Sequence, residues 1–223
     1  MSYAIAIDGP SGAGKSTIAK RVAKELSFIY VDTGAMYRAM ALYVLEQNID
    51  PQDQAKVAAV CPDIDVTILY EAGVQQVLLN GKNVSAEIRQ EIVGNTASKI
   101  SVIKEVREKL VALQRQLAAK ENVVMDGRDI GTQVLPDATV KIYLTASAKE
   151  RAKRRYLELQ EKGMPGELDQ IEADIIERDN RDMNREISPL RQAEDAVLVD
   201  ASFMGIEEVT AAVIAEFEKK KQA

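Results

Sequence analysis

The sequence predicts an α/β protein of three layers, in which helices cover both faces of a central parallel sheet. Short runs of four or five apolar residues recur along the chain, several of them ending in aspartate, and segments with helical periodicity separate them. Such runs are typical of strands buried on both faces, and their alternation with helices is typical of a parallel sheet. The predicted strands lie at 3–8, 28–32, 122–126, 140–144 and 196–200. Ligands of these sheets bind beyond the carboxyl ends of the strands, so we expect a site near Asp8, Asp32 and Asp126.

The first predicted strand leads into a glycine-rich loop and a helix. The stretch IDGPSGAGKST fits G-x-x-x-x-G-K-[ST] over residues 9–16, and residues 15–26 have the pattern of an amphipathic helix. Glycines let backbone N–H groups turn inward around an anion, and the helix adds its positive end. This context favours a P-loop that binds a nucleoside triphosphate over a turn without a ligand, with Lys15 on the β- and γ-phosphates and the Ser16 hydroxyl on Mg²⁺. The predicted loop residues are Gly9, Pro10, Ser11, Gly12, Ala13, Gly14, Lys15, Ser16 and Thr17.

The composition excludes several kinds of chemistry and partner. The 223 residues include no histidine and a single cysteine, Cys61, which excludes Ser-His-Asp and Cys-His catalysis, imidazole zinc sites and an intrachain disulfide. The net charge of −6 argues against a nucleic-acid partner. No apolar run approaches the roughly 18 residues of a membrane span, and the first residues do not resemble a signal peptide. We therefore expect a cytoplasmic protein.

A P-loop alone leaves a GTPase switch, a motor and a small-molecule kinase open. The chain has no Asn-Lys-x-Asp guanine motif, and a kinase needs a second anion site. One candidate is VDTGAMYR at 31–38, where Thr33 begins a predicted helix whose N-terminus suits an anion and Arg38 lies about one turn further on. A capped helix with a solvated arginine explains this stretch equally well.

A second candidate is MDGRDIG at 125–131. It places Asp126 at a strand end, where it resembles a Walker B acid able to hold Mg²⁺, and puts Arg128 and Asp129 just beyond. A surface ion pair is the alternative.

Two stretches interrupt the alternation of strands and helices. Residues 65–85 are rich in β-branched residues, with turn signals at Ala72-Gly73 and Asn80-Gly81, and predict a small antiparallel insert. Residues 149–186 predict two charged helices joined by KGMPGE, a Gly/Pro hinge that would form the tip of a lid.

The second charged helix carries the strongest indication of phosphoryl transfer. Arg178, Arg181, Asp182 and Arg185 follow i, i+3, i+4, i+7 spacing and are expected on one helical stripe, while Arg151, Arg154 and Arg155 lie on the preceding helix. Cations on a closing element would neutralise the transferring phosphoryl group. A solvated face is the alternative.

Taken together, GPSGAGKST, DTGAMYR, DGRDIGT followed by PDA, and RDNRDMNR resemble the motifs of the bacterial cytidylate kinases, within the nucleoside monophosphate kinase group. The resemblance covers essentially the whole chain, including the insert at 65–85. It implies a P-loop NTPase fold and a Mg²⁺-dependent transfer of the γ-phosphoryl group of ATP to CMP, and to dCMP. We expect a monomer whose partners are small nucleotides, neither nucleic acid nor a membrane.

The resemblance also implies roles for individual residues. The implied CMP site consists of Thr33, Arg38, Ser98, Arg107, Arg128, Asp129, Arg178, Asp182 and Arg185. Within it, Ser98, Arg107 and Asp129 would recognise cytosine, and Asp182 would bind the ribose hydroxyls. Arg154 would contact ATP, and the implied catalytic set is Lys15, Arg128, Arg178, Arg181 and Arg185. Ser98 and Arg107 would face opposite sides of an unbroken helix, so we expect a break or kink near 100–103 if both touch one base.

We expect three parts in the chain. A P-loop core would comprise 1–35, 104–149 and 187–223, a monophosphate-binding region 36–103, and a lid 150–186. Two other functions stay open: a kinase of the same fold with another acceptor such as UMP, and a nucleotide-dependent switch whose insert docks a partner.

Overall fold

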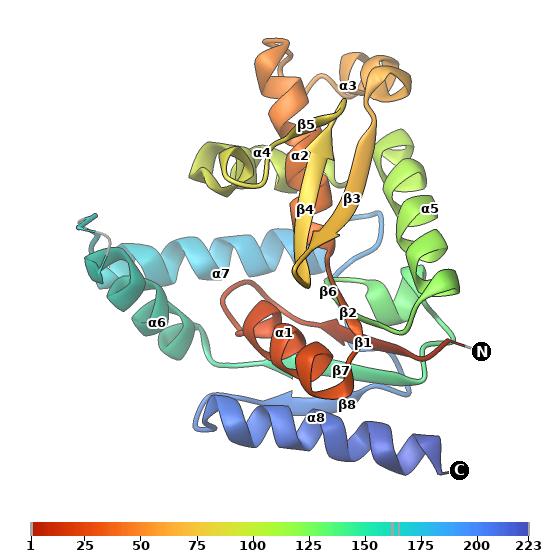
Figure 1. The fold of residues 1–223 in the computed structure, drawn as a ribbon. Coiled ribbons are helices and arrows are strands. Elements are labelled where there is room, and N and C mark those ends of the chain that lie inside the picture. The colour runs from red at the N-terminus through yellow and green to blue at the C-terminus, as the bar shows by residue number, and fades with distance from the viewer. Residues whose placement is uncertain (1, 162, 165, 223) are drawn as a thin grey trace. The chain divides into compact units, whose positions relative to one another are not determined.

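The computed structural model describes residues 2–161, 163–164 and 166–222, and the chain forms two compact units (Figure 1). The first unit comprises Met1–Phe28 and Asn122–Ala223, and the second comprises Ile29–Glu121. Lys162 and Pro165 of the predicted KGMPGE hinge lie outside the described residues.

The first unit contains four strands of the central parallel sheet. In spatial order they are β6 (Val123–Gly127), β1 (Ala4–Asp8), β7 (Val140–Thr145) and β8 (Val197–Asp200). Strand β1 pairs in parallel with β6 on one side and β7 on the other, so Ile5 lies between Val124 and Val140. Ile5 is completely buried, as a strand covered on both faces requires. The α/β class with a parallel central sheet is confirmed.

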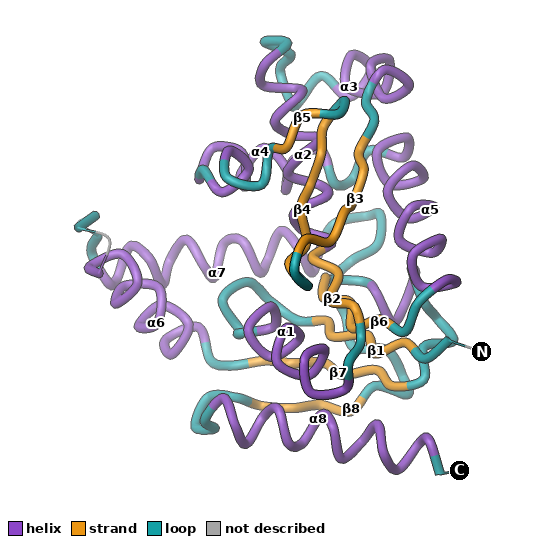
Figure 2. Tube along the Cα trace, in the orientation of Figure 1, coloured by secondary structure: helices purple, strands orange, loops and turns teal. Residues whose placement is uncertain are grey.

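Helices pack around this sheet. They are α1 (Lys15–Leu26), α6 (Ala148–Glu161), α7 (Leu168–Asn184) and α8 (Ile206–Lys221). Helix α1 packs on β6 and on α8, and α8 also contacts β7, so α1 and α8 together cover part of the sheet (Figure 2). Helices α6 and α7, which correspond to the two predicted charged helices, pack against each other. None of the helices in the described ranges is long and apolar enough to cross a membrane.

Helix α7 is shorter than predicted. The expected stripe extends to Arg185, but α7 ends at Asn184, and Arg185 has an extended backbone with φ −64° and ψ 143°. The chain turns back at this point, because the Leu190 N–H donates to the Asp182 carbonyl at 2.8 Å and the Arg185 Nε donates to the Ser188 carbonyl at 2.6 Å. Arg185 therefore lies on the loop after α7.

The second unit combines helices with a small antiparallel sheet. Its longer elements are β2 (Ile29–Asp32), α2 (Thr33–Glu46), α3 (Gln54–Val60), α4 (Glu91–Ile100) and α5 (Lys104–Lys120). The sheet consists of β3 (Val66–Glu71), β4 (Val74–Leu79) and β5 (Lys82–Asn83). Both predicted turns have left-handed backbones, with φ of 49° and 78° at Ala72 and Gly73 and of 48° and 81° at Asn80 and Gly81. These values suit tight hairpins, and the predicted insert is confirmed.

The expected break between Ser98 and Arg107 is also present. Helix α4 ends at Ile100 and α5 begins at Lys104. Ile103 has an extended backbone, with φ −77° and ψ 128°, and its side chain is buried. The helix therefore does not run through residues 101–103.

Candidate active site

The P-loop follows β1, and its glycines are required by geometry. A Cβ on Gly9 would lie 1.9 Å from the Leu144 carbonyl oxygen, so no larger residue fits there without moving β7 or the loop. Gly12 and Gly14 have φ of 76° and 93°, which L-residues rarely adopt, and Gly14 immediately precedes α1. The structure thus confirms the strand, loop and helix that the motif predicted.

Lys15 is buried inside this loop. Its Nζ donates a hydrogen bond to the Pro10 carbonyl at 2.8 Å. Burial and the nearby cations Arg128 and Arg178 lower the pKa of Lys15 well below its ordinary value, and Asp126 and Asp8 only partly oppose them. Asp126 and Asp8 therefore only partly compensate the charge of buried Lys15, and a bound phosphate group would supply further negative charge.

Ser16 and Asp126 lie together, as predicted for a Mg²⁺ site. The Ser16 hydroxyl donates to Asp126 Oδ2 at 2.9 Å, and Asp126 is buried at the end of β6. Hydroxyl and carboxylate oxygens are donors that Mg²⁺ prefers, and Mg²⁺ commonly takes its other ligands from water and nucleotide phosphates. The described part of the chain has no group of three or more acidic, Cys or His side chains that could form an all-protein metal site. The pair therefore fits Mg²⁺ bound together with a nucleotide.

Asp8 holds the loop that follows β6, a role the sequence did not reveal. Its two carboxylate oxygens accept the Ile130 N–H at 2.8 Å and the Gly131 N–H at 2.7 Å. Burial raises the pKa of Asp8 to about 6 despite these two hydrogen bonds. Asp8 thereby ties the end of β1 to the backbone next to Asp129, whereas the sequence indicated only that a strand-end acid was present.

Three predicted arginines gather around Asp182. Arg128 Nε lies 2.9 Å from Asp182 Oδ2 in a hydrogen-bonded ion pair. Burial tends to raise the pKa of Asp182, but Arg128, Arg178 and Arg185 together hold it below its ordinary value. Arg185 Nη2 also lies 4.0 Å from Asp129 Oδ1. Arg128 and Arg178 are also among the charged groups near enough to lower the pKa of Lys15.

Arg181 and Arg154 lie elsewhere on the charged helices. Arg181 is half exposed, and its Nε is 3.7 Å from Glu177 Oε1 one turn earlier in α7. Arg154 is exposed, and its Nη2 donates to the Ala201 carbonyl at 2.6 Å. Neither is among the main groups that shift the pKa of Lys15 or Asp182. Their roles toward ATP and the transferring group stay predictions.

Arg151 joins three elements of the first unit, which the sequence also did not reveal. From α6 it donates to the Ala146 carbonyl at the end of β7, at 2.8 Å, and to the Ser11 carbonyl of the P-loop, at 2.9 Å. It also forms a two-bond ion pair with Asp179 of α7, with Nη1 3.1 Å from Oδ1. Arg151 is buried, so the P-loop and the two charged helices are connected through one guanidinium group.

The second unit contains the other predicted substrate residues, Thr33 and Arg38 on α2 and Ser98 and Arg107 on α4 and α5. Thr33 is buried at the first position of α2, and Asp32 caps this helix by accepting the Ala35 N–H at 2.8 Å. Arg38, one turn into the helix, reaches back to Asp32, with Nη2 3.2 Å from Oδ2. The helix start at Thr33 is confirmed.

Ser98 and Arg107 lie on either side of the break between α4 and α5. The Ser98 carbonyl accepts the Ser101 hydroxyl at 2.9 Å, and Arg107 Nη1 donates to the Tyr37 hydroxyl at 3.3 Å. Arg107 is buried although it is charged, which makes a purely solvated role untenable. Whether both residues contact one base stays a prediction.

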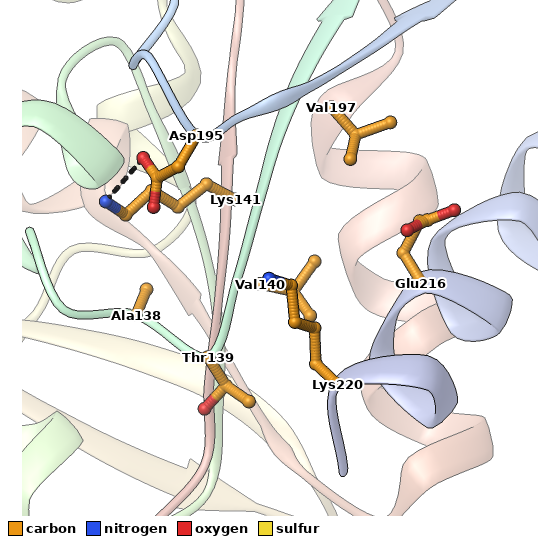
Figure 3. Close-up of a pocket in the computed structure, with 8 residues that line it drawn as sticks. All are labelled: Ala138, Thr139, Val140, Lys141, Asp195, Val197, Glu216 and Lys220. Carbon is orange, nitrogen blue, oxygen red and sulfur yellow. Dashed lines mark hydrogen bonds and ion pairs between the residues drawn. The ribbon is translucent and has the colours of Figure 1, made fainter. Parts of the chain in front are cut away.

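A small pocket near the amino ends of β7 and β8 is unrelated to these residues (Figure 3). It has a volume of about 30 Å³ and includes Lys141, whose Nζ donates to Asp195 Oδ1 at 2.8 Å. This volume admits a water molecule or two rather than a nucleotide. It lies at the edge of the sheet opposite the strand ends where ligands of such folds bind.

A P-loop after β1, an acid near the end of β6, and arginines on the loop after β6, on α7 and just after α7 are together characteristic of P-loop kinases. The fold agrees with a gluconokinase structure from Sinorhizobium meliloti, with a TM-score of 0.51 and 14% identity over 97% of this chain and 92% of that one. At this identity the likeness concerns the fold alone.

The sequence comparisons identify the family. A family profile described as cytidylate kinase matches residues 5–219. A cytidylate kinase of Caldicellulosiruptor saccharolyticus is 54% identical over 96% of this chain and 95% of that protein, and one of Lactobacillus johnsonii is 48% identical over 98% and 95%. The chain belongs to the cytidylate kinase family and is a nucleoside monophosphate kinase.

Proposed function

We propose that this protein transfers the γ-phosphoryl group of ATP to CMP, and also to dCMP, in a Mg²⁺-dependent reaction. The observation that supports this most is the group of Arg128, Arg178 and Arg185 around Asp182, of which Arg128 pairs with Asp182 at 2.9 Å and Arg128 and Arg178 also lower the pKa of the P-loop lysine. A nucleotide switch needs one phosphate site, whereas phosphoryl transfer between nucleotides needs cations for the phosphates of both. The choice of CMP rests on the names of the relatives and on the residues that match the family's motifs.

The reaction needs no covalent enzyme intermediate. An oxygen of the acceptor phosphate is already anionic, attacks the γ-phosphorus and displaces ADP, so catalysis consists of positioning and charge neutralisation. Lys15 binds the phosphates of ATP within the P-loop, and Arg128, Arg178 and Arg185 neutralise the charge that spreads over the transferring group. Arg181 and Arg154 contribute from the charged helices. This chemistry is compatible with a chain that has no histidine.

Ser16 and Asp126 are the residues that would hold Mg²⁺. When bound, the ion supplies positive charge to the ATP phosphates. The hydrogen bond between the two side chains keeps both oxygen donors beside the first turn of α1.

Different residues recognise the phosphate, the ribose and the base of the acceptor. Thr33 and Arg38 bind the phosphate, and Asp182 binds the ribose hydroxyls. Ser98, Arg107 and Asp129 recognise cytosine, whose amino group needs an acceptor such as the Asp129 carboxylate. Such a site favours CMP over UMP, since uracil carries a carbonyl oxygen in place of that amino group.

The test is release of ADP from Mg-ATP in the presence of CMP, dCMP, UMP, AMP or no acceptor. We expect release to depend on CMP or dCMP and to stay at background with AMP or without acceptor. Lys15→Ala should reduce turnover by several orders of magnitude, whereas Lys20→Ala, an exposed lysine of the same helix, should leave it unchanged. ADP release at one rate with and without acceptors would contradict the proposal and favour an ATP-driven switch.

A further inference from the structure

Arg89 lies beside the phosphate-binding residues assigned to the second unit. Its Nη1 is 3.6 Å from Asp32 Oδ2, and Arg38 Nη2 is 3.2 Å from the same oxygen. Two guanidinium groups therefore share one carboxylate oxygen at the N-terminus of α2. The side chain of Arg38 is 23% exposed and that of Arg89 is 59% exposed, so a ligand from solvent can reach both.

The backbone that carries these groups is firmly held. Arg89 ends a 3₁₀ turn, Glu87–Arg89, in which Ile88 is completely buried and which packs against α2. Strand β4 fixes Asp32, because the Gln75 side chain accepts the Asp32 N–H at 2.8 Å and donates to the Asp32 carbonyl at 3.3 Å. Arg38 lies against the first turn of α2, where a Cβ on Gly34 would come within 3.1 Å of its Nη1. The geometry of the pair is thus set by α2, β4 and the 3₁₀ turn.

The cluster of Asp32, Arg38 and Arg89 has positive charge in excess. One carboxylate faces two guanidinium groups, and the N-terminus of α2 adds its partial positive charge. Arg38 Nε is buried and has no hydrogen-bond partner among the described residues. A buried donor without a partner is costly, and a phosphate group accepts several hydrogen bonds from guanidinium groups at once. The cluster therefore offers donors and charge that Asp32 alone does not satisfy.

We propose that Arg89 is a second ligand of the acceptor phosphate, acting with Arg38. This rests on the proposed function, because it assumes that Arg38 binds the phosphate of CMP. Asp32 keeps the two arginines together in the free protein, and the more highly charged phosphate then bridges them. Two arginines can hold the non-attacking oxygens of the acceptor and leave its third oxygen directed at ATP.

The experiment compares Arg89→Ala, Arg89→Lys and Lys82→Ala. Lys82 is an exposed cation of the same segment, 3.6 Å from Glu87, and serves as the control. We expect Arg89→Ala to lower kcat/KM about tenfold, as for loss of a charge-assisted hydrogen bond, and by the same factor for CMP and UMP. The KM for ATP should not change. Arg89→Lys should recover part of the loss, and Lys82→Ala should behave as wild type.

The outcomes separate this proposal from the proposed function. If wild type transfers the phosphoryl group to CMP and Arg89→Ala is as active as wild type, Arg89 is a solvated surface residue and the inference is wrong. A loss that differs between CMP and UMP would show that Arg89 acts through the base-recognition segment, which also overturns it. If wild type transfers to no nucleotide, the proposed function fails, and calorimetric titration with CMP still tests Arg89, since Arg89→Ala should weaken CMP binding without weakening ATP binding.

Discussion

Asp182 is the carboxylate around which the predicted phosphate-binding cations of the first unit gather. Arg128 is hydrogen-bonded to it, and Arg178 and Arg185 are close enough to lower its pKa. Three guanidinium groups near one another repel, so a carboxylate among them stabilises the folded protein. Asp32 plays the same part for Arg38 and Arg89 in the second unit. At both places an aspartate holds arginines in position in the free protein.

This arrangement predicts how stability depends on pH. The pKa of Asp182 is lower in the folded protein than its ordinary value of 3.8, so the folded state binds this proton less readily than the unfolded state. Its stabilising contribution is complete above pH 3.8 and is lost as the pH falls through the folded pKa. We expect Asp182→Asn to lower the free energy of unfolding by about 1–3 kcal/mol at pH 7, and the difference from wild type to shrink below pH 3.8.

Chemical denaturation at a series of pH values would measure this difference. Asp174→Asn, at an exposed position of the same helix, is the matched control and should stay within about 0.5 kcal/mol of wild type throughout. A constant difference between wild type and Asp182→Asn from pH 7 to pH 3 would show that the side chain contributes by shape and not by charge.

Helices α6 and α7 are connected to the P-loop through Arg151. Its guanidinium group binds carbonyls at the end of β7 and in the P-loop and pairs with Asp179 of α7. A buried ion pair is costly to desolvate, and such a pair is often matched in stability by apolar residues of similar size. We therefore expect the main effect of this ion pair to be on position, because it links the helix that carries Arg178 and Asp182 to the loop that carries Lys15.

Two variants separate the contribution of Arg151 to stability from its contribution to the position of the P-loop. Arg151→Met should lower the free energy of unfolding by about 3–5 kcal/mol, because Asp179 stays buried without its partner. The double variant Arg151→Met, Asp179→Leu should recover most of that loss. Both variants should have a higher KM for ATP than wild type, because the Ser11 carbonyl lacks its donor in each.

The control for this pair of variants is Arg155→Met on the same helix. Arg155 forms an exposed ion pair with Glu158 at 3.0 Å, so its loss should change the free energy of unfolding by less than about 1 kcal/mol. If the KM for ATP returns to the wild-type value in the double variant, Arg151 does not position the P-loop.

The elements could be predicted from sequence because their causes are local. Apolar runs predicted the strands, and Asn80-Gly81 predicted a turn from local sequence alone. Contacts between distant segments could not be predicted: Asp8 binds the backbone at Ile130, and Arg151 pairs with Asp179. The end of α7 was missed for the same reason, since a contact between Leu190 and Asp182 determines it. Candidate site residues were predicted where a motif contained them or, for Ser98 and Arg107, where the family resemblance implied them, whereas Arg89 lies outside every motif.

The molecule as a whole is negatively charged, yet its substrates are anions. A net charge of −6 repels nucleotides at long range, so we expect binding to depend on the local arginine groups of the two units. Those groups act over short distances, because salt screens charges beyond about 10 Å. We therefore expect elements that carry arginines to come close to the phosphates at the moment of transfer, and we expect α6 and α7 to be the mobile ones among them.

The outer portions of α6 and α7 expose apolar side chains, with Leu157 at 50% and Ile176 at 46% exposure, and the helices pack mainly on each other. Arg151 and Asp179 anchor the opposite end in the first unit. We therefore expect hydrogen exchange in the free protein to be fast in residues 157–161 and 168–176 and slower near Asp179. An analogue that joins both nucleotides should protect the outer portions, and an ATP analogue alone should do so less. Amides of β1, whose Ile5 and Ile7 are completely buried, serve as the internal reference and should not change. Equal exchange of α6 and α7 with and without the joined analogue would mean that these helices form a rigid arm, and Arg181 would then be a solvated residue of its exposed face.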